Sequence, residues 1–236
     1  MTTAGILNVG DELLAGEIVN GNGMWLADRL TGRGVDVREI RVIPDEGPII
    51  ERTVTAFVDR FDHTIVTGGL GSTPDDVTLE AVANALERPL EVDPAARADV
   101  EGTVREIEAE VPDFEYDVER AARYPTGARP IPNEEGIMPG CVVETVYVFP
   151  GIPVEMKAVF ERVEGEFAGD VRSRSVYSDV PESNLNPLLR ELQERFDVGV
   201  GCYPGEKRKR ITVTATDPER LEAAHEWLSS RPEVED

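Results

Sequence analysis

Two hydrophobic patterns alternate along the first third of the chain: short runs of apolar residues, and apolar residues repeated at helical spacing. The short runs predict strands at residues 6–10, 35–43 and 63–67. The helical spacing predicts helices at residues 22–33, 48–61 and 75–86. Strands and helices in strict alternation imply parallel strands joined by right-handed crossovers. The pattern therefore predicts a doubly wound α/β fold, with a mostly parallel sheet between helices.

The middle of the chain extends this pattern. Residues 94–110 predict an acidic helix. Residues 124–140 are rich in proline and glycine and predict an extended loop or a pair of short edge strands. Further apolar runs predict strands at residues 141–143 and 146–149, followed by a helix that Pro153 opens and that continues to about residue 167.

A second pattern begins near Val171. It predicts, in order, a strand at residues 173–177, a helix at 181–196, a hairpin of 198–203 and 210–215, and a helix at 218–229. This β-α-β-β-α order describes a small α+β domain. We therefore expect two domains, residues 1–170 and residues 171–236.

The charge balance is strongly acidic. Aspartate and glutamate total 47 against 24 lysines and arginines, which gives a net charge of −23. The acids lie in nearly every segment, which favours a halophilic protein of a salt-rich cytoplasm. At 1 M salt the Debye length falls to about 3 Å, so the repulsion among these acids would be largely screened. An acidic surface for a basic partner is the alternative. Either surface argues against nucleic acid or an anionic membrane as the main partner, because phosphate backbones need basic patches.

Other sequence features exclude some classes of site. No stretch reaches the length of a transmembrane helix and the N-terminus lacks a signal pattern, so we expect a cytoplasmic protein without a membrane partner. Cys141 and Cys202 lack metal-ligand spacing, and we expect two buried free thiols. His63 and His225 are the only histidines and fall at structural positions, which excludes a zinc site or a histidine-based triad.

The most informative motif is the glycine loop, Thr67 to Asp76, which reads TGGLGSTPDD. Gly68, Gly69 and Gly71 follow a buried strand and allow backbone N–H groups to approach an anion closely. Ser72 and Thr73 add hydroxyl donors. No lysine follows, so this is not a nucleoside-triphosphate P-loop. The loop predicts a binding site for the phosphate of a small molecule.

Acidic residues accompany the loop. Asp75 and Asp76 suit either helix capping or function. Two acids beside a phosphate would repel the ligand unless a cation intervenes, so we expect Mg²⁺ or another divalent cation there, held by Asp75 and Asp76. In a variant of this hypothesis Asp75 only caps the helix while Asp76 points at the ligand.

Two more strands end in acids on the same predicted edge of the sheet. Asp11 and Glu12 follow the first strand, and Asp45 and Glu46 follow the second. Any one such acid is more often a turn residue than a catalyst. Three acidic strand ends on one edge of a parallel sheet favour a site there, because ligands of such folds bind at the carboxyl ends of the strands.

The basic run Lys207 to Arg210 is unusual on so acidic a chain. It could meet a ligand phosphate or a neighbouring subunit. A solvated tip of the predicted hairpin is the favoured interpretation.

Several spaced motifs within residues 5 to about 160 resemble CinA-type (competence/damage-inducible protein A) proteins. They are the run from Gly10 to Asn20 (GDELLAGEIVN), the glycine loop, Ile131–Asn133 with Gly136 and Pro139–Gly140, and Pro150 to Met156 (PGIPVEM). Ser72 stands where that family usually has proline. The resemblance implies the MoaB/MogA molybdopterin-binding fold.

The resemblance also implies roles for particular residues. In MogA-like relatives, acids matching Asp45 and Asp76 serve in molybdopterin adenylylation. In CinA-type relatives, the equivalent domain is associated with metal-dependent cleavage of ADP-ribose at its pyrophosphate. Because the chain ends without the deamidase domain of full-length CinA proteins, deamidation of nicotinamide mononucleotide is not predicted.

Three functions follow as hypotheses. The first is a Mg²⁺- or Co²⁺-assisted pyrophosphatase of ADP-ribose type, with the phosphate on residues 68–73 and Asp45 and Asp76 as catalytic residues. The second is molybdopterin binding or adenylylation, and the third is non-catalytic assembly. Asp11, Glu12, Pro150 and Gly151 are further site candidates. We expect a homo-oligomer, a dimer by CinA resemblance or a trimer by MogA resemblance.

Overall fold

The computed structural model describes residues 1–71, 73, 76–111, 113–205 and 208–235. These form two compact units. The larger comprises residues 2–31 and 36–168, and the smaller comprises Met1, residues 32–35 and residues 169–236. Each unit is described by itself.

A six-stranded sheet forms the centre of the larger unit. Its strand order is β2 (Asp36–Ile43), β1 (Thr3–Val9), β3 (His63–Thr67), β8 (Val146–Phe149), β7 (Gly140–Val143) and β6 (Arg129–Ile131). The first four strands are parallel, and β7 and β6 are antiparallel to their neighbours. The prediction of a mostly parallel sheet is confirmed.

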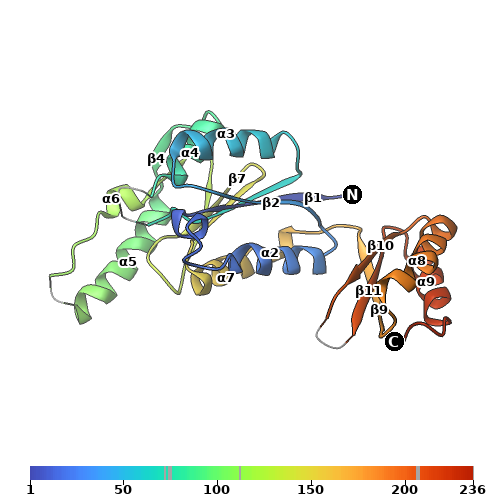
Figure 1. Cartoon of the computed structure of the whole chain (residues 1–236). Coiled ribbons are helices and arrows are strands. Elements are labelled where there is room, and N and C mark those ends of the chain that lie inside the picture. Colours follow the sequence, from blue (N-terminus) through green and yellow to red (C-terminus); the bar gives the residue numbers. More distant parts are fainter. Residues whose placement is uncertain (72, 74–75, 112, 206–207, 236) are drawn as a thin grey trace. The chain divides into compact units, whose positions relative to one another are not determined.

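Helices cover both faces of this sheet (Figure 1). On one face lie α3 (Gly47–Val58) and α4 (Thr78–Ala85), and on the other lie α2 (Gly21–Gly32) and α7 (Pro153–Glu161). Successive side chains of a strand point to opposite faces, so strands covered on both faces are apolar throughout. Accordingly, Ile6 and Leu7 of β1 are both fully buried. The doubly wound α/β prediction is confirmed.

Six further elements among the described residues complete the larger unit. They are α1 (Asp11–Leu14), β4 (Leu90–Val92), α5 (Pro94–Glu110), α6 (Val118–Ala121), β5 (Arg123–Pro125) and the 3₁₀ turn η1 (Glu164–Glu166). The acidic helix is confirmed as α5. The two edge strands predicted within residues 124–140 exist but belong to different sheets, since β5 pairs with β4 and β6 pairs with β7. The sequence did not predict α1, α6 or β4, because three or four residues carry too little periodicity.

Three predicted helix bounds were wrong. The helix expected at residues 48–61 ends at Val58. The helix expected at residues 75–86 begins at Thr78, with Val77 as its N-cap. Asp76 instead accepts hydrogen bonds from the Thr73 N–H (2.9 Å) and hydroxyl (2.6 Å), which holds residue 76 in the loop. The helix expected to reach about residue 167 ends at Glu161, and η1 follows it.

The smaller unit has the predicted β-α-β-β-α order. It contains β9 (Arg172–Ser178), α8 (Glu182–Phe196), β10 (Gly199–Tyr203), β11 (Lys209–Ala215) and α9 (Pro218–Ser229), and its antiparallel sheet has the order β10-β11-β9. Leu185 and Leu192 of α8 are fully buried in its core. Asp217 caps α9 by accepting from the N–H groups of Glu219 and Arg220.

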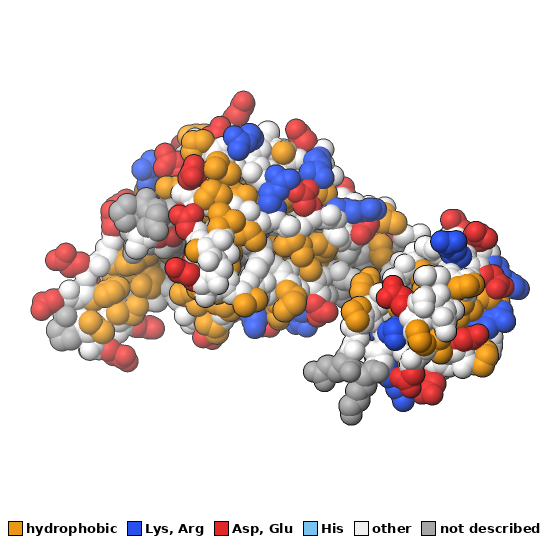
Figure 2. Space-filling model, in the orientation of Figure 1, with side chains coloured by type: hydrophobic (Ala, Val, Ile, Leu, Met, Phe, Trp, Pro, Cys, Tyr) orange, Lys and Arg blue, Asp and Glu red, His pale blue; other side chains and the backbone are white. Residues whose placement is uncertain are grey.

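The surface and the cysteines show three further features. Acidic side chains are spread over the face shown in Figure 2 rather than gathered in one patch. No helix in the described part of the chain is long and apolar enough to cross a membrane. Cys141 and Cys202 are free; Cys141 is buried, and burial raises the pKa of its thiol to about 12. Cys202 is only partly buried, in contrast to the prediction.

Candidate functional site

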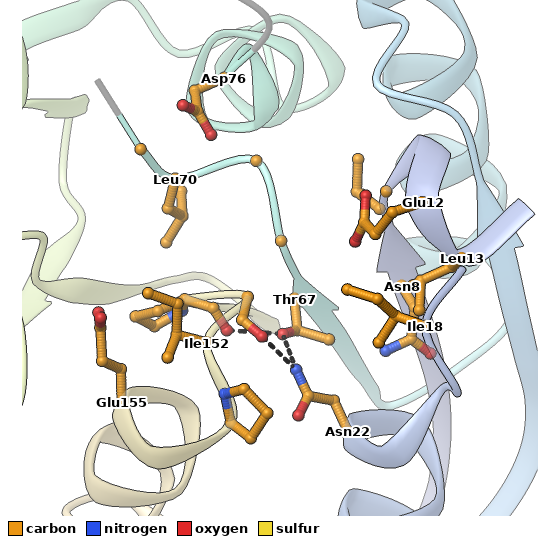
Figure 3. A pocket seen from close by; sticks show the side chains of 18 of the residues that line it. Asn8, Glu12, Leu13, Ile18, Asn22, Thr67, Leu70, Asp76, Ile152 and Glu155 are labelled. Carbon is orange, nitrogen blue, oxygen red and sulfur yellow. Dashed lines mark hydrogen bonds between the residues drawn. The ribbon is translucent and has the colours of Figure 1, made fainter. Parts of the chain in front are cut away.

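A cavity of about 650 Å³ opens at the carboxyl ends of the parallel strands. Its walls come from the segments that follow β1, β2, β3 and β8, together with residues 136–138. This is where ligands bind in doubly wound folds. Figure 3 shows the side chains that line the cavity, among them Asp76, Glu12 and Glu155 from three separate parts of the chain.

The glycine loop forms one wall of the cavity. Gly68 and Gly69 have φ angles of 104° and 65°, which side-chain-bearing residues rarely adopt. The Gly68 N–H donates to the Phe149 carbonyl (3.2 Å), so it is already used. The next three N–H groups, of Gly69, Leu70 and Gly71, have no acceptor among the described residues. Consecutive unpaired N–H groups of this kind form an anion-binding concavity.

Asp45 and Asp76 lie on either side of this loop. A Cβ atom built at Gly69 would be 3.4 Å from Asp45 Oδ1, and one built at Gly71 would clash with the Asp76 carboxylate. Asp45 at the end of β2 and Asp76 before α4 are therefore brought to one loop, where they contact positions 69 and 71. Glycine leaves the space that these carboxylates occupy.

Hydrogen bonds fix both carboxylates. Asp45 Oδ2 accepts from the Asp11 N–H at 2.9 Å, which joins the end of β2 to the start of α1. Asp76 Oδ2 is the oxygen held by Thr73, and Asp76 Oδ1 has no partner within the described residues. Arg120 of α6 supports the same loop, donating to the Thr73 carbonyl at 3.1 Å and to the Asp76 carbonyl at 3.5 Å.

This arrangement suits one of two modes of metal binding. Residues with assigned positions contain no group of three or more histidine, cysteine or acidic side chains that could hold an ion by protein ligands alone. Mg²⁺ is more often bound by one or two carboxylates together with substrate phosphates and water. Asp45 and Asp76, beside unpaired N–H groups that suit a phosphate, fit this second mode.

Glu155, in the first turn of α7, contributes another carboxyl group to the cavity. It accepts a hydrogen bond of 2.8 Å from Asn133, a buried residue with 3% exposure. Asn133 is held in turn by the Met138 carbonyl (3.0 Å) and the Glu135 N–H (3.2 Å). Burial raises the pKa of Glu155; the charge of Glu135 acts in the same direction, and the bond from Asn133 opposes it. A carboxyl group with a raised pKa in a cavity suits proton transfer.

Tyr116 lies within electrostatic range of both Asp76 and Glu155. Burial raises the pKa of its phenol, and the negative charges of Asp76 and Glu155 raise it further, while Arg120 opposes them. The two carboxylates thus act on one side chain that also lines the cavity. They face the same space, although they lie 79 positions apart in the sequence.

The opposite wall carries three asparagines. Asn20 Oδ1 accepts from the Gly23 N–H at 3.0 Å, and Asn20 Nδ2 donates to Asn8 Oδ1 at 3.0 Å. Because a backbone N–H can only donate, this chain fixes the orientation of both amides. It leaves Asn8 Nδ2, on a residue with 1% exposure, without a partner among the described atoms. Asn22 Nδ2 donates to the Gly151 carbonyl at 2.7 Å, which connects this wall to the Pro150–Gly151 turn.

Comparison with known proteins places the larger unit in a family. Residues 5–167 match the family described as "Probable molybdopterin binding domain". The crystal structure of the protein CinA from Thermoplasma acidophilum matches with a TM-score of 0.64 and 30% identity, over 70% of this chain and 98% of that chain. The chain is a CinA-type member of this family.

Two further relatives match over most of their length. A protein of Archaeoglobus fulgidus is 32% identical over 224 residues, covering 93% of each chain. Protein TK1472 of Thermococcus kodakarensis is 34% identical over 242 residues, covering 97% of this chain and 96% of the relative. Residues 170–235 match the middle domain of FAD synthase, so the small unit of this CinA-type chain is similar to that domain.

The structure places the predicted site residues as follows. The cavity is lined by Gly68, Gly69, Gly71, Asp45, Asp76, Glu12, Pro150 and Gly151. Asp11 and Thr73 do not line it; they hold Asp45 and Asp76 by the hydrogen bonds described above. Ser72 and Asp75, predicted for phosphate and metal, lie outside the described residues.

The residues that line the cavity include neither histidine and none of the described residues of the basic run. Lys207 is outside the described residues, Arg208 pairs with Glu235 at 2.8 Å, and the Arg210 guanidinium lies 5.5 Å from the ring centroid of Tyr203. His63 packs edge-on against Tyr147 and Phe167, and burial lowers its pKa. These local contacts are consistent with structural roles.

Sequence reasoning missed Glu155, Asn133, Tyr116 and the asparagine wall. Glu155 lies inside the motif Pro150 to Met156, so an acid soon after a strand-end turn was an available signal. Nothing local to Asn133 or Tyr116 indicates that they meet Glu155, because their loops are brought to it by the tertiary fold.

Proposed function

We propose that this CinA-type chain is a metal-dependent hydrolase that cleaves the pyrophosphate of a nucleotide of the ADP-ribose type. One observation carries the proposal: Asp45 and Asp76 lie close to a loop that lines a cavity of about 650 Å³, and the N–H groups of residues 69–71 in this loop have no acceptor among the described residues. The N–H groups suit a phosphoryl oxygen, and the carboxylates suit a divalent cation.

Binding follows from the walls of the cavity. Its volume lies within the roughly 300–1,000 Å³ that is typical of small-molecule sites. Apolar side chains offer contacts to a flat ring and a sugar; they include Leu13, Ile18, Leu70, Ile137, Met138 and Ile152. The N–H groups of Gly69, Leu70 and Gly71 would donate to a phosphoryl group at the other end of the ligand.

Asp45 and Asp76 would hold the cation together with the ligand phosphates. When bound, the cation would neutralise the charge of the phosphates and stabilise the negative charge on the phosphoryl oxygens in the transition state. The anchoring of Asp45 by the Asp11 N–H and of Asp76 by Thr73 keeps both carboxylates in place before the ligand arrives.

Glu155 is the group suited to activate water. The water oxygen forms a bond to phosphorus, its proton passes to the Glu155 carboxylate, and the bond from phosphorus to the bridging oxygen breaks. The electron pair of that bond leaves with the second phosphate, so ADP-ribose gives AMP and ribose 5-phosphate. Asn133 positions Glu155 for this transfer through the 2.8 Å hydrogen bond.

A second candidate is molybdopterin binding or adenylylation. The family description, "Probable molybdopterin binding domain", favours it. The similarity of residues 170–235 to a domain of FAD synthase instead favours the first candidate, because FAD is a dinucleotide with a pyrophosphate linkage. Both candidates use the same cavity and differ in the reaction product.

The test is AMP release from ADP-ribose. The purified chain is incubated in high KCl with Mg²⁺ or Co²⁺, and AMP is followed by chromatography. Asp76→Asn keeps an oxygen for the Thr73 donors but removes the charge, and we expect it to lower kcat by about 10²–10³-fold, as loss of a charge-stabilising group does. Asp28→Asn, an exposed change on α2 away from the cavity, is the control and should match wild type. Wild type no faster than Asp76→Asn contradicts the proposal for this substrate and leaves molybdopterin as the candidate.

A further inference from the structure

A second, smaller cavity of about 140 Å³ lies against the glycine loop. The two cavities share six lining residues: Gly69, Leu70, Gly71, Asp76, Tyr116 and Met138. The smaller one is completed by residues of α4, β4, α6 and β5. A group held by the loop N–H groups therefore lies at the meeting point of both cavities.

The charges of the two cavities differ. The described lining of the larger cavity includes four carboxylates, from Glu12, Asp45, Asp76 and Glu155, and no basic side chain. The smaller cavity adds two arginines, Arg120 and Arg123, with Asp76, Glu80 and Asp117 as its acids. On a chain with a net charge of −23, the arginines that line these cavities are thus on one side of the loop.

Backbone and capping contacts hold this arginine side in place. Arg120 donates to the carbonyls of Thr73 and Asp76, and its N–H is capped by Asp117 at 3.0 Å. Among the described residues, Arg123 makes a single long hydrogen bond, 3.4 Å to the Leu90 carbonyl, and no ion pair with a carboxylate.

We propose that the smaller cavity is a phosphoryl-binding subsite, in which one phosphoryl group of the ligand lies between the loop N–H groups and Arg120 and Arg123. The organic part of the ligand then occupies the larger cavity. This inference rests on the proposed function in one respect, that the ligand is phosphorylated. It names a ligand class: an organic phosphate or diphosphate that reaches across the loop.

The size of the cavity and its arginine side chains both suit a phosphoryl group. A volume of 140 Å³ is below the range of sites that hold whole small molecules, but it admits one tetrahedral anion. Arginine is suited to phosphate because its planar fork can donate two parallel hydrogen bonds to phosphate oxygens. The larger cavity, with four acids, binds phosphate only with the help of a cation.

The test compares a ligand with and without its phosphate. Binding of AMP and of adenosine to the full chain is measured by calorimetry at one KCl concentration without divalent cation. Arg123→Gln should weaken AMP binding by about tenfold or more, because charge-assisted hydrogen bonds are lost, and should leave adenosine binding unchanged. The control is Arg105→Gln on α5, since Arg105 is 72% exposed and pairs only locally with Glu101.

Three outcomes would overturn the subsite. They are equal AMP affinity in wild type and Arg123→Gln, an equal loss of AMP and adenosine binding in that variant, and no preference of wild type for AMP over adenosine. A thermal unfolding curve like that of wild type excludes misfolding of the variant, and Arg120→Lys, which keeps the charge but loses the fork, provides a second reading. The proposed function fails separately: AMP binding that depends on Arg123 without ADP-ribose cleavage leaves the subsite intact.

Discussion

The two cavities that meet at residues 69–71 share one stretch of backbone and differ in the charge around it. On the larger side, carboxylates from four segments face the ligand, whereas the smaller side adds Arg120 and Arg123. Arginine on the smaller side could donate charge-assisted hydrogen bonds to a phosphate, whereas the charged side chains described on the larger side are carboxylates, which would need a cation to bind one. Under the proposed function, this difference would separate anchoring from chemistry across a single loop, with the metal-dependent step on the side that carries four acids.

The largest effect that would sharpen this comparison is expected from Glu155→Gln. If Glu155 takes the proton from water, the variant should lose about 10²-fold or more in the rate of AMP release, with substrate affinity unchanged. The same change at Glu161, at the exposed end of α7, is the control.

The pH profile separates proton transfer from packing. Burial raises the pKa of Glu155, so wild-type activity should fall on the acid side at a higher pH than an ordinary glutamate would give. In Glu155→Gln this acid limb should disappear. An unchanged acid limb in a slow variant would contradict the role of Glu155 as base.

Gly69→Ala should have an effect of intermediate size, and it should alter both cavities because Gly69 lines each of them. Gly69 has a φ of 65°, and a Cβ there would clash with the buried Thr78 side chain. We expect the free energy of unfolding to fall by about 1 kcal/mol or more, and AMP binding to weaken as the N–H groups move. Gly102→Ala, on α5 with open space around its Cβ, should instead stabilise the chain by about 0.5–1 kcal/mol. Equal effects of the two changes on unfolding and AMP affinity would show that the loop geometry is unimportant.

The smallest effect is a pH-dependent gain in stability in Glu155→Gln. The native state raises the pKa of Glu155 above its unfolded value, so it binds the proton more tightly than the unfolded state does. The stability contributed by this group is complete below the unfolded pKa and is lost as pH rises through the folded pKa. Glutamine stays neutral, so the variant should melt slightly above wild type at neutral pH and with wild type under acid conditions. A lower melting temperature at neutral pH would contradict this.

The sequence predicted the fold and part of the site for identifiable reasons. The apolar runs of β1 and β3 and the helical spacing of α2 and α3 follow directly from burial on both faces. Parallel strands bring the acids that follow them to one edge of the sheet, and the family resemblance indicated Asp45 and Asp76 among these acids; the structure places both against the glycine loop.

Other parts of the site depend on contacts that no local pattern contains. Glu155 is paired with Asn133, 22 residues earlier, and Arg120 supports the loop from a residue 47 positions beyond Thr73. The start of α4 was misplaced because Asp76 resembles a capping residue in the sequence but bonds back to Thr73 in the structure. Tertiary contacts of this kind decide which polar residues share a cavity.

The most direct test of the account is the linkage between Mg²⁺ and ADP binding on the acidic side of the loop. Calorimetry at fixed KCl would measure the affinity of ADP with and without Mg²⁺, for wild type and for Asp45→Asn/Asp76→Asn. The second phosphate of ADP can reach the acidic side, so we expect Mg²⁺ to tighten ADP binding in wild type and to have no effect in the double variant, whose cavity has lost both charges. Wild-type affinity that is the same with and without Mg²⁺ would contradict the claim that these carboxylates bind a phosphorylated ligand through a cation.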